Sequence, residues 1–224
     1  MRDVFQQEMR EVQSRLVELA ELVHVSIANA VQAFNETDVV VAEEVIQNDS
    51  RIDELTIELD ELAINILARQ APVARDLRIV VSALRISASL ERMGDMSGHI
   101  AQLARYRFPD RVVPKGLRST FKEMGRLDVE MAGNLAELLR TQDVKIAEQI
   151  RNDDDKVDEL HASVFDKILG DTWSGETVAA VDATLASRYH ERFADHAVSI
   201  AKKVLYLVTG DWTGADDEVA PRAS

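Results

Sequence analysis

The sequence contains two copies of one helical pattern, and this duplication limits the folds that the chain can adopt. Residues 47–55 (QNDSRIDEL) recur as residues 151–160 (RNDDDKVDEL), and residues 89–101 (SLERMGDMSGHIA) recur as residues 189–201 (YHERFADHAVSIA). Copies that lie about 100 residues apart indicate a duplicated small domain, because solenoid repeats are only about 20–50 residues long. We therefore expect two units of similar fold in tandem.

Apolar residues recur along the chain at steps of three and four, which places them on one face of a helix. In the first helix this face comprises Phe5, Met9, Val12, Leu16, Leu19, Val23, Ile27, Val31 and Phe34. The chain has only 5% aromatic residues, 9 Gly and 4 Pro. This composition argues against a many-stranded β fold, which needs frequent turn residues. The chain is therefore predicted to be all-α.

Proline and glycine divide the pattern into three helices followed by three more. Thr37 and Asp38 are N-cap types that begin the second helix, and we expect this helix to bend near residues 48–50. Further helices are expected over residues 74–106, 117–140 and 143–169, with a last one ending near Gly210. We predict one three-helix bundle over residues 1–108 and a second over residues 115–210. Residues 211–224 are predicted to form an acidic, disordered tail.

The net charge of the chain limits the classes of partner that it can bind. A formal net charge of −14 disfavours binding to nucleic acid and to anionic lipid, so we expect any membrane contact to be indirect. The absence of cysteine excludes thiolate chemistry. The sequence has no run of 18 apolar residues and no secretory signal, which favours a cytoplasmic protein.

Each copy carries two pairs of acidic residues spaced four apart, so that each pair projects from one helix face. The pairs are Asp49/Asp53 and Glu91/Asp95 in the first copy, and Asp154/Asp158 and Glu191/Asp195 in the second. Chance alone gives about seven such pairs in a chain with 40 acidic residues, and most mark a solvated face.

The positions of these pairs around the helix axes support a metal-binding site. In both copies the first pair lies along the same edge of the apolar stripe of its helix. Glu91 and Asp95 continue the apolar stripe of the third helix. Four carboxylates on neighbouring helices would provide hard oxygen ligands for Mg, Mn, Ca or iron. We favour the first copy, because Arg188 shares the acidic face of the second and offers an internal counter-ion there.

Signs of catalysis are few. Glu21 and His24 have the spacing of one di-iron ligand pair, but a ferritin-like site needs two such motifs, and Asp158 and His161 only imitate the second. The sequence has no phosphate-binding glycine loop, nucleophile elbow or metalloprotease motif. We therefore predict a protein that is not an enzyme. The alternatives are a ferritin-like carboxylate metalloprotein or metal-storage protein, and a plain helical scaffold.

Residues 69–80 (RQAPVARDLRIV) and 90–101 (LERMGDMSGHIA) together resemble the PhoU family of bacterial phosphate-transport accessory proteins. They are similar to the family segment R-Q-x-P-x-x-x-D-L-R-x-V, followed by L-E-R-I-G-D-x-A-x-N-I. Residues 189–204 (YHERFADHAVSIAKKV) are similar to the family's second motif, E-R-x-x-D-H-A-x-N-I-A. The resemblance covers the chain apart from the acidic tail.

The resemblance implies duplicated three-helix bundles, often dimeric, that bind a multinuclear metal cluster on each bundle through the four acidic pairs. It implies Mn, Mg, Fe or Zn as the metal. It also implies a negative regulator of phosphate uptake and of the phosphate-starvation response, acting on a sensor histidine kinase and the phosphate ABC transporter without enzymatic activity. His99 stands where the family has Asn, and Asp153–Asp155 leaves the ligand register open. His99, Asp155 and His196 are therefore candidate accessory ligands.

Overall fold

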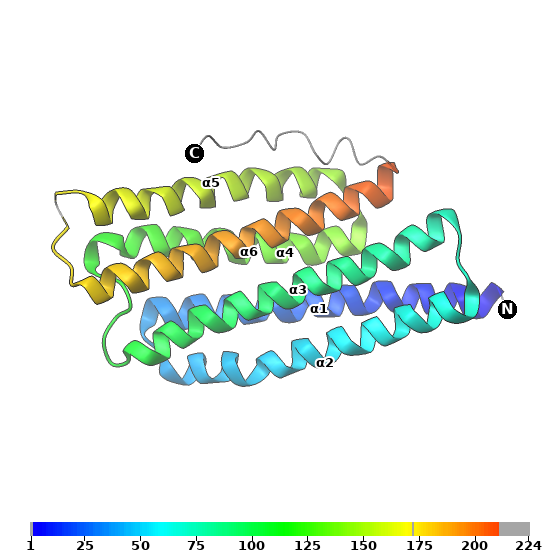
Figure 1. Cartoon of the computed structure of the whole chain (residues 1–224), viewed down its shortest axis with the longest axis horizontal. Helices are drawn as coiled ribbons and strands as arrows, with labels where there is room; N and C mark the ends of the chain where they lie inside the picture. The colour runs from blue at the N-terminus through cyan, green and yellow to red at the C-terminus, as the bar shows by residue number, and fades with distance from the viewer. Residues whose placement is uncertain (1, 172, 211–224) are drawn as a thin grey trace.

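The computed structural model describes residues 2–171 and 173–210, which are almost entirely helical (Figure 1). The helices are α1 (Arg2–Glu36), α2 (Val39–Gln70), α3 (Ala74–Arg107), α4 (Arg118–Thr141), α5 (Val144–Leu169) and α6 (Thr177–Thr209), with a short 3-10 helix, η1 (Lys115–Leu117), before α4. The described residues contain no strand, so the prediction of an all-α chain is confirmed. The prediction for the tail falls on residues 211–224, outside the described part.

The same local signals end the first helix and begin the second helix of both halves. The Asp38 carboxylate caps α2 by accepting hydrogen bonds from the backbone N–H groups of Val40 (3.0 Å) and Val41 (3.2 Å). Asp143 caps α5 in the same way. The residue before each cap, Thr37 or Gln142, has a positive φ, which ends the preceding helix. The predicted start of the second helix is confirmed, and α2 continues through residues 48–50 as one helix.

The two halves pack side by side, with α2 and α5 at the outer edges (Figure 1). Between the halves, α1 lies antiparallel to α4. The Phe34 and Phe121 rings are 5.4 Å apart at one end of this seam. At the other end, the Gln13 side chain donates to the Leu139 carbonyl oxygen at 3.4 Å. At successive contacts the residue numbers therefore increase along one helix as they decrease along the other.

Helices α3 and α6 form a second antiparallel seam. Arg107, at the end of α3, pairs with Asp182 near the start of α6 through two hydrogen bonds, of 2.5 and 3.0 Å. Farther along, the His99 and Tyr189 rings are 4.9 Å apart. Two antiparallel seams between equivalent helices indicate that the halves are related by an approximate twofold axis.

The apolar side chains of both halves form one continuous buried core. Helix α1 is central to it: residues such as Leu19, Ile27 and Ala30 are completely buried. By length and composition alone, Val4–Glu36 is also apolar enough to cross a membrane, with a window of mean hydropathy 1.2. Its contacts with α2, α3 and α4 account for this apolar composition within the fold.

A buried polar pair lies beside the α1–α4 seam. His190 Nδ1 of α6 is 2.6 Å from Asp128 Oδ2 of α4, and the two side chains are 1% and 0% exposed. The His190 ring also contacts Phe34 and Phe121. Because an unpaired charge is costly in such a site, this pair ties α4 to α6 in one arrangement.

Glycine permits the close approach of α1 and α4. A Cβ atom added at Gly125 would lie 2.6 Å from Val31 Cγ1, which is far inside van der Waals contact. A Cβ atom added at Gly133, on the same helix, would lie 3.5 Å from the His24 ring, at an ordinary contact distance. The seam therefore requires glycine at one of these positions and tolerates a methyl group at the other.

We predict that Gly125→Ala lowers the free energy of unfolding by about 1–3 kcal/mol, because the new methyl group forces the β-branched Val31 or the whole helix to move. Gly133→Ala is the matched control. It should be neutral or stabilising by up to about 1 kcal/mol, because alanine is the better helix former. Urea unfolding of both variants measures the difference, and equal stabilities would contradict the close packing.

Candidate metal centres

The predicted acidic pairs of the first half face each other across α2 and α3. The Asp49 carboxylate lies against the backbone of α3, where a Cβ atom at Gly94 would be 3.5 Å from Asp49 Oδ1 and one at Gly98 would be 3.7 Å from Oδ2. The two glycines therefore leave room for this carboxylate. We call Asp49, Asp53, Glu91 and Asp95 the first acidic cluster.

The carboxylates of the first cluster affect one another. Burial raises the pKa of Asp49, and the negative charges of Asp53 and Asp95 raise it further. Burial also raises the pKa of Glu91, followed by the charge of Asp95. Arg92 opposes this repulsion, since its guanidinium lies 2.9 Å from Asp95 Oδ2 and 3.5 Å from Glu91 Oε2. The cluster is thus only partly neutralised.

The second acidic cluster consists of Asp154 and Asp158 on α5 and Glu191 and Asp195 on α6, and here the pKa of one carboxyl is raised further than in the first cluster. Burial raises the pKa of Asp154 to about 7, with further contributions from Asp158 and Asp195. Burial and the charge of Asp195 also raise the pKa of Glu191, although Arg188 pairs with this carboxylate. The sequence favoured the first half as the metal site, but the structure places the larger perturbation in the second.

Two buried oxygens of the second cluster have no hydrogen-bond donor in the described part of the chain, Asp154 Oδ1 and Glu191 Oε2. Glu191 is only 9% exposed. A buried carboxylate oxygen is stable when a donor or a cation satisfies it. The carboxylate oxygens of this cluster are therefore suitable ligands for a hard divalent ion.

The structure settles the register of the three consecutive aspartates. Asp153 is 2% exposed and accepts hydrogen bonds from Gln149 Nε2 (2.9 Å) and Lys156 Nζ (2.8 Å). Asp154 interacts instead with the acidic residues of α6, and Asp155 is exposed. Asp154 is thus the structural counterpart of Asp49, a choice that sequence spacing left open.

The two histidines considered as accessory ligands have different surroundings. His99 stacks on Tyr189 and its positive charge would lower the pKa of Asp49, so it lies beside the first cluster. Burial lowers the pKa of His196, and the positive charges of Arg192 and Arg92 lower it further. Such cationic surroundings oppose a metal ion at His196.

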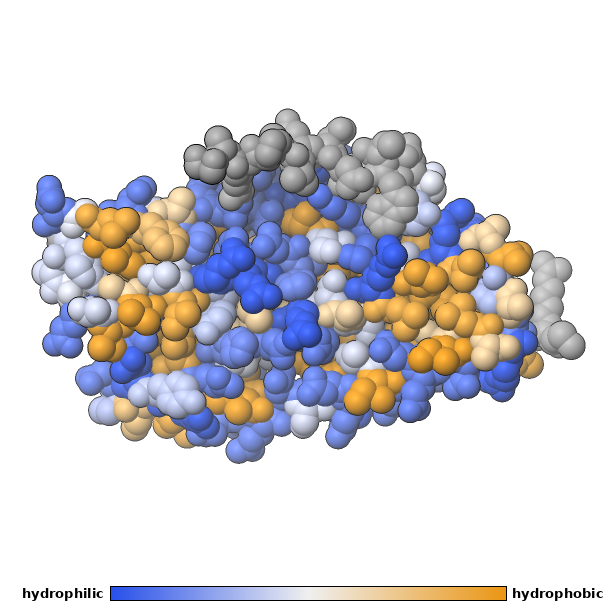
Figure 2. All heavy atoms as spheres, viewed as in Figure 1, coloured by the Kyte–Doolittle hydropathy of each residue, from blue (hydrophilic) through white to orange (hydrophobic). Residues whose placement is uncertain are grey.

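The carboxylates are electrostatic neighbours, but their side chains do not converge on one point. Among the described residues, no three His, Asp or Glu side chains are close enough together to hold a metal ion. The members of each cluster would have to turn inward to share an ion. Figure 2 shows hydrophilic residues over the middle of one face of the molecule and hydrophobic residues towards both ends.

Other sequence candidates take structural roles. Glu21 forms an ion pair with Arg140 at 2.6 Å, and the His24 ring packs near Gly133, so these two residues do not build a di-iron site. Sequence reasoning identified Arg188 as a counter-ion but missed Arg92. The signal was present, because Arg92 follows Glu91 directly and precedes Asp95 by three residues, which is one helical turn.

Comparison with known proteins gives a consistent result for both halves. The family model described as PhoU domain matches residues 16–104 and 121–204. The phosphate-specific transport system accessory protein PhoU homolog 2 of Mycobacterium tuberculosis is 40% identical, over 94% of this chain and 99% of that protein. Homolog 1 of Mycobacterium leprae is 38% identical, over 99% of each chain.

Solved structures share the architecture. The crystal structure of PhoU from Pseudomonas aeruginosa superposes with a TM-score of 0.85 at 27% identity, covering 92% of this chain and all of that one. The phosphate transport system regulatory protein PhoU from Streptococcus pneumoniae gives a TM-score of 0.81 at 25% identity, covering 93% and 98%. The duplicated six-helix arrangement is therefore common to these proteins.

We predict that Asp154→Asn stabilises the metal-free protein at pH 8 and not at pH 4.5. The folded carboxyl has a pKa of about 7 against an ordinary value of 3.8, so stability falls as the pH rises between these values. An asparagine side chain does not ionise, so the variant keeps the stability that the wild-type protein loses as the pH rises. Because the site is partly exposed, we expect a gain of about 1–2 kcal/mol, or roughly 2–8 °C in melting temperature.

The measurement is thermal unfolding with a chelator present. Asp166→Asn is the control, since this exposed side chain lies farther along α5 and outside the cluster. The assigned electrostatics would be wrong if both variants changed the melting temperature equally, or if Asp154→Asn acted equally at both pH values.

Proposed function

Because this chain belongs to the PhoU family, we propose that it is a negative regulator of phosphate uptake and of the phosphate-starvation response. The observation that carries the proposal is that both halves match the PhoU domain, together with the likeness over almost the whole chain to accessory proteins of phosphate-specific transport. We propose a sensor histidine kinase and the phosphate ABC transporter as its partners. It would act in the cytoplasm as a homodimer and reach the membrane only through the transporter.

The proposed action is by binding and not by catalysis. Two side-chain pairs resemble parts of a catalytic site, but neither is open to a substrate. Asp128 and His190 are fully enclosed between α4 and α6. Ser187, which lies 3.0 Å from His161 Nδ1, is 0% exposed. Helical surfaces of this kind support recognition of partner helices and segments.

We further propose that each acidic cluster binds divalent metal ions. In the first half Asp49, Asp53, Glu91 and Asp95 would hold them, and the raised pKa values of Asp49 and Glu91 mark the repulsion that a cation relieves. The ions would supply structural charge neutralisation. Oxygen-only donors favour Mn or Mg, with Fe and Zn as the alternatives.

The second half would bind metal through Asp154, Asp158, Glu191 and Asp195. Two features support this assignment: the unsatisfied buried oxygens of Asp154 and Glu191, and the pKa of Asp154 near 7. A metal ion that binds only the folded chain stabilises it. Loading would therefore fix α5 against α6, and the partner surfaces with them.

Manganese at about 100 times its dissociation constant should stabilise the chelator-treated protein by about 2.7 kcal/mol for each cluster that binds it, or roughly 5–10 °C in melting temperature for each. The double variant Asp154→Asn/Glu191→Gln removes the second site and should lose part of this rise, and Asp49→Asn/Glu91→Gln should lose another part. Glu123→Gln is the control, because this exposed acid pairs with Arg126 outside both clusters. An unchanged response in both double variants would exclude these ligands.

Deleting the gene should raise alkaline phosphatase, or another phosphate-starvation reporter, in cells grown with abundant phosphate. We expect an increase of roughly tenfold or more, which corresponds to about 1.4 kcal/mol of lost repression. Reintroducing the wild-type gene should restore repression. Full repression in a strain that lacks this gene and every other PhoU-family gene would contradict the regulatory proposal.

A further inference from the structure

One end of the α1–α4 seam is closed by the chain itself. The linker between the two halves crosses this end and buries Val112, Val113 and Leu117, which are 3%, 5% and 1% exposed. Arg111 fastens the linker by donating to the carbonyl oxygen of Asn35 at the end of α1. An irregular peptide segment with apolar side chains is therefore what the fold accepts at this end.

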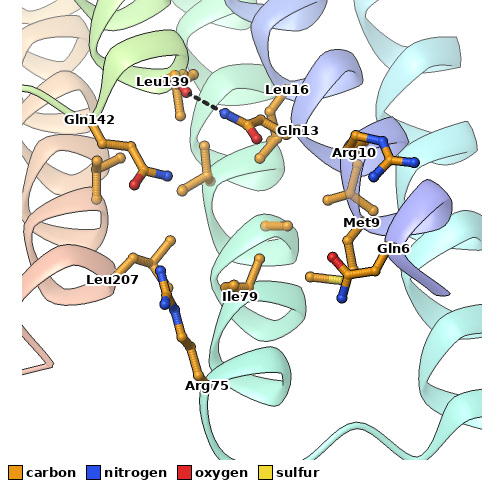
Figure 3. A pocket seen from close by; sticks show the side chains of 14 residues that line it. Gln6, Met9, Arg10, Gln13, Leu16, Arg75, Ile79, Leu139, Gln142 and Leu207 are labelled. Carbon is orange, nitrogen blue, oxygen red and sulfur yellow. Dashed lines mark hydrogen bonds between the residues drawn. The ribbon is translucent and has the colours of Figure 1, made fainter. Parts of the chain in front are cut away.

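The opposite end of the same seam contains a hollow of about 220 Å³ (Figure 3). The approximate twofold axis places this hollow where a second linker would lie. Leu139 shows the equivalence, since it stands four residues before the N-cap Asp143, as Phe34 stands four residues before Asp38. Phe34 borders the linker, and Leu139 borders the hollow.

The floor of the hollow is apolar. It is formed by side chains of α1, α3 and α6, among them Leu16, Ile79, Ala83, Ile86 and Val204. A cavity of about 150 Å³ is large enough for benzene. The hollow therefore has room for one aromatic or two aliphatic side chains.

The rim is polar and positive. Arg10 and Arg75 lie at the mouth with Gln6, Gln13 and Gln142, and Figure 3 shows Arg75 extending beside Leu207. None of the described residues that line the hollow is acidic, although the chain carries 40 acidic residues. A rim of this charge attracts carboxylates.

We propose that this hollow binds an acidic peptide segment of a partner protein, with an apolar side chain on the floor and carboxylates against Arg10 and Arg75. The proposal rests on the proposed function, because the segment belongs to a protein that this chain regulates. The linker at the other end of the seam argues for a peptide. A membrane surface or a nucleic acid would also meet the rest of a chain whose net charge is −14, whereas a short peptide segment meets only the positive rim.

The first test uses peptides built on residues 108–117, the segment that fills the equivalent position. The acidic probe carries the substitutions Arg111→Glu and Lys115→Glu, and the unsubstituted segment is the charge control. A third peptide adds Val112→Ser and Val113→Ser to the acidic probe. By titration calorimetry we expect the acidic probe to bind at least roughly tenfold more tightly than either control.

Variants of the protein locate the binding. The Arg10→Glu/Arg75→Glu double variant changes only exposed side chains and should reverse the preference in favour of the unsubstituted peptide. Ala83→Leu extends a side chain from the floor into the hollow and should weaken the acidic probe by roughly tenfold. Circular dichroism of each variant checks that it is folded. Equal affinity for all three peptides, or no reversal in the double variant, overturns the proposal.

Three further outcomes are decisive. If a protein ending at Gly210 binds the acidic probe and the full chain does not, the chain's own C-terminal residues occupy the hollow, and the assignment to a partner is wrong. In cells, Arg10→Glu/Arg75→Glu should lose repression of the phosphate-starvation reporter. If this variant represses normally while the deletion strain does not, the hollow is not the partner site, and the proposed function stands. If a strain that lacks this gene and every other PhoU-family gene represses normally, the proposed function fails independently of the calorimetry.

Discussion

The close antiparallel packing of equivalent helices, α1 against α4 and α3 against α6, determines the rest of the structure. Gly125 lets α1 and α4 approach until Val31 occupies the space of a missing side chain. The buried Asp128–His190 pair lies beside this seam and leaves α4 and α6 one favourable arrangement. Since the two seams use four helices, α2 and α5 lie at the edges, and each brings its acidic residues against the outer side of a seam helix.

This arrangement concentrates like charge where burial makes it costly. Asp154 has a pKa of about 7 because burial holds it away from water and because other carboxylates lie near it. Arginine relieves the repulsion only in part, through Arg92 in one half and Arg188 in the other. Such repulsion lowers the stability of the fold, and this cost is the basis of the proposal that each cluster binds a cation.

Several elements were predictable because their signals are local. Asp38 marks a helix start through its own carboxylate, and the acidic pairs share a face because of helical geometry alone. The four-residue spacing pairs Asp154 with Asp158, but the neighbouring aspartates left the ligand register open. The positions of Gln149 and Lys156 show that Asp153 is a satisfied carboxylate, whereas Asp154 lies near the acidic residues of α6. The positive hollow was also beyond the sequence, because its lining comes from helices far apart along the chain.

The sequence by itself determined the duplicated helical pattern, the helix boundaries and the four acidic pairs, because periodicity, capping and spacing act within a few turns of one helix. The tertiary structure decided which half carries the stronger electrostatic perturbation, which arginines compensate it and which end of the α1–α4 seam remains open. These properties depend on distances between residues of different helices. Burial and electrostatic interaction vary with such distances, and no local pattern in the chain fixes them.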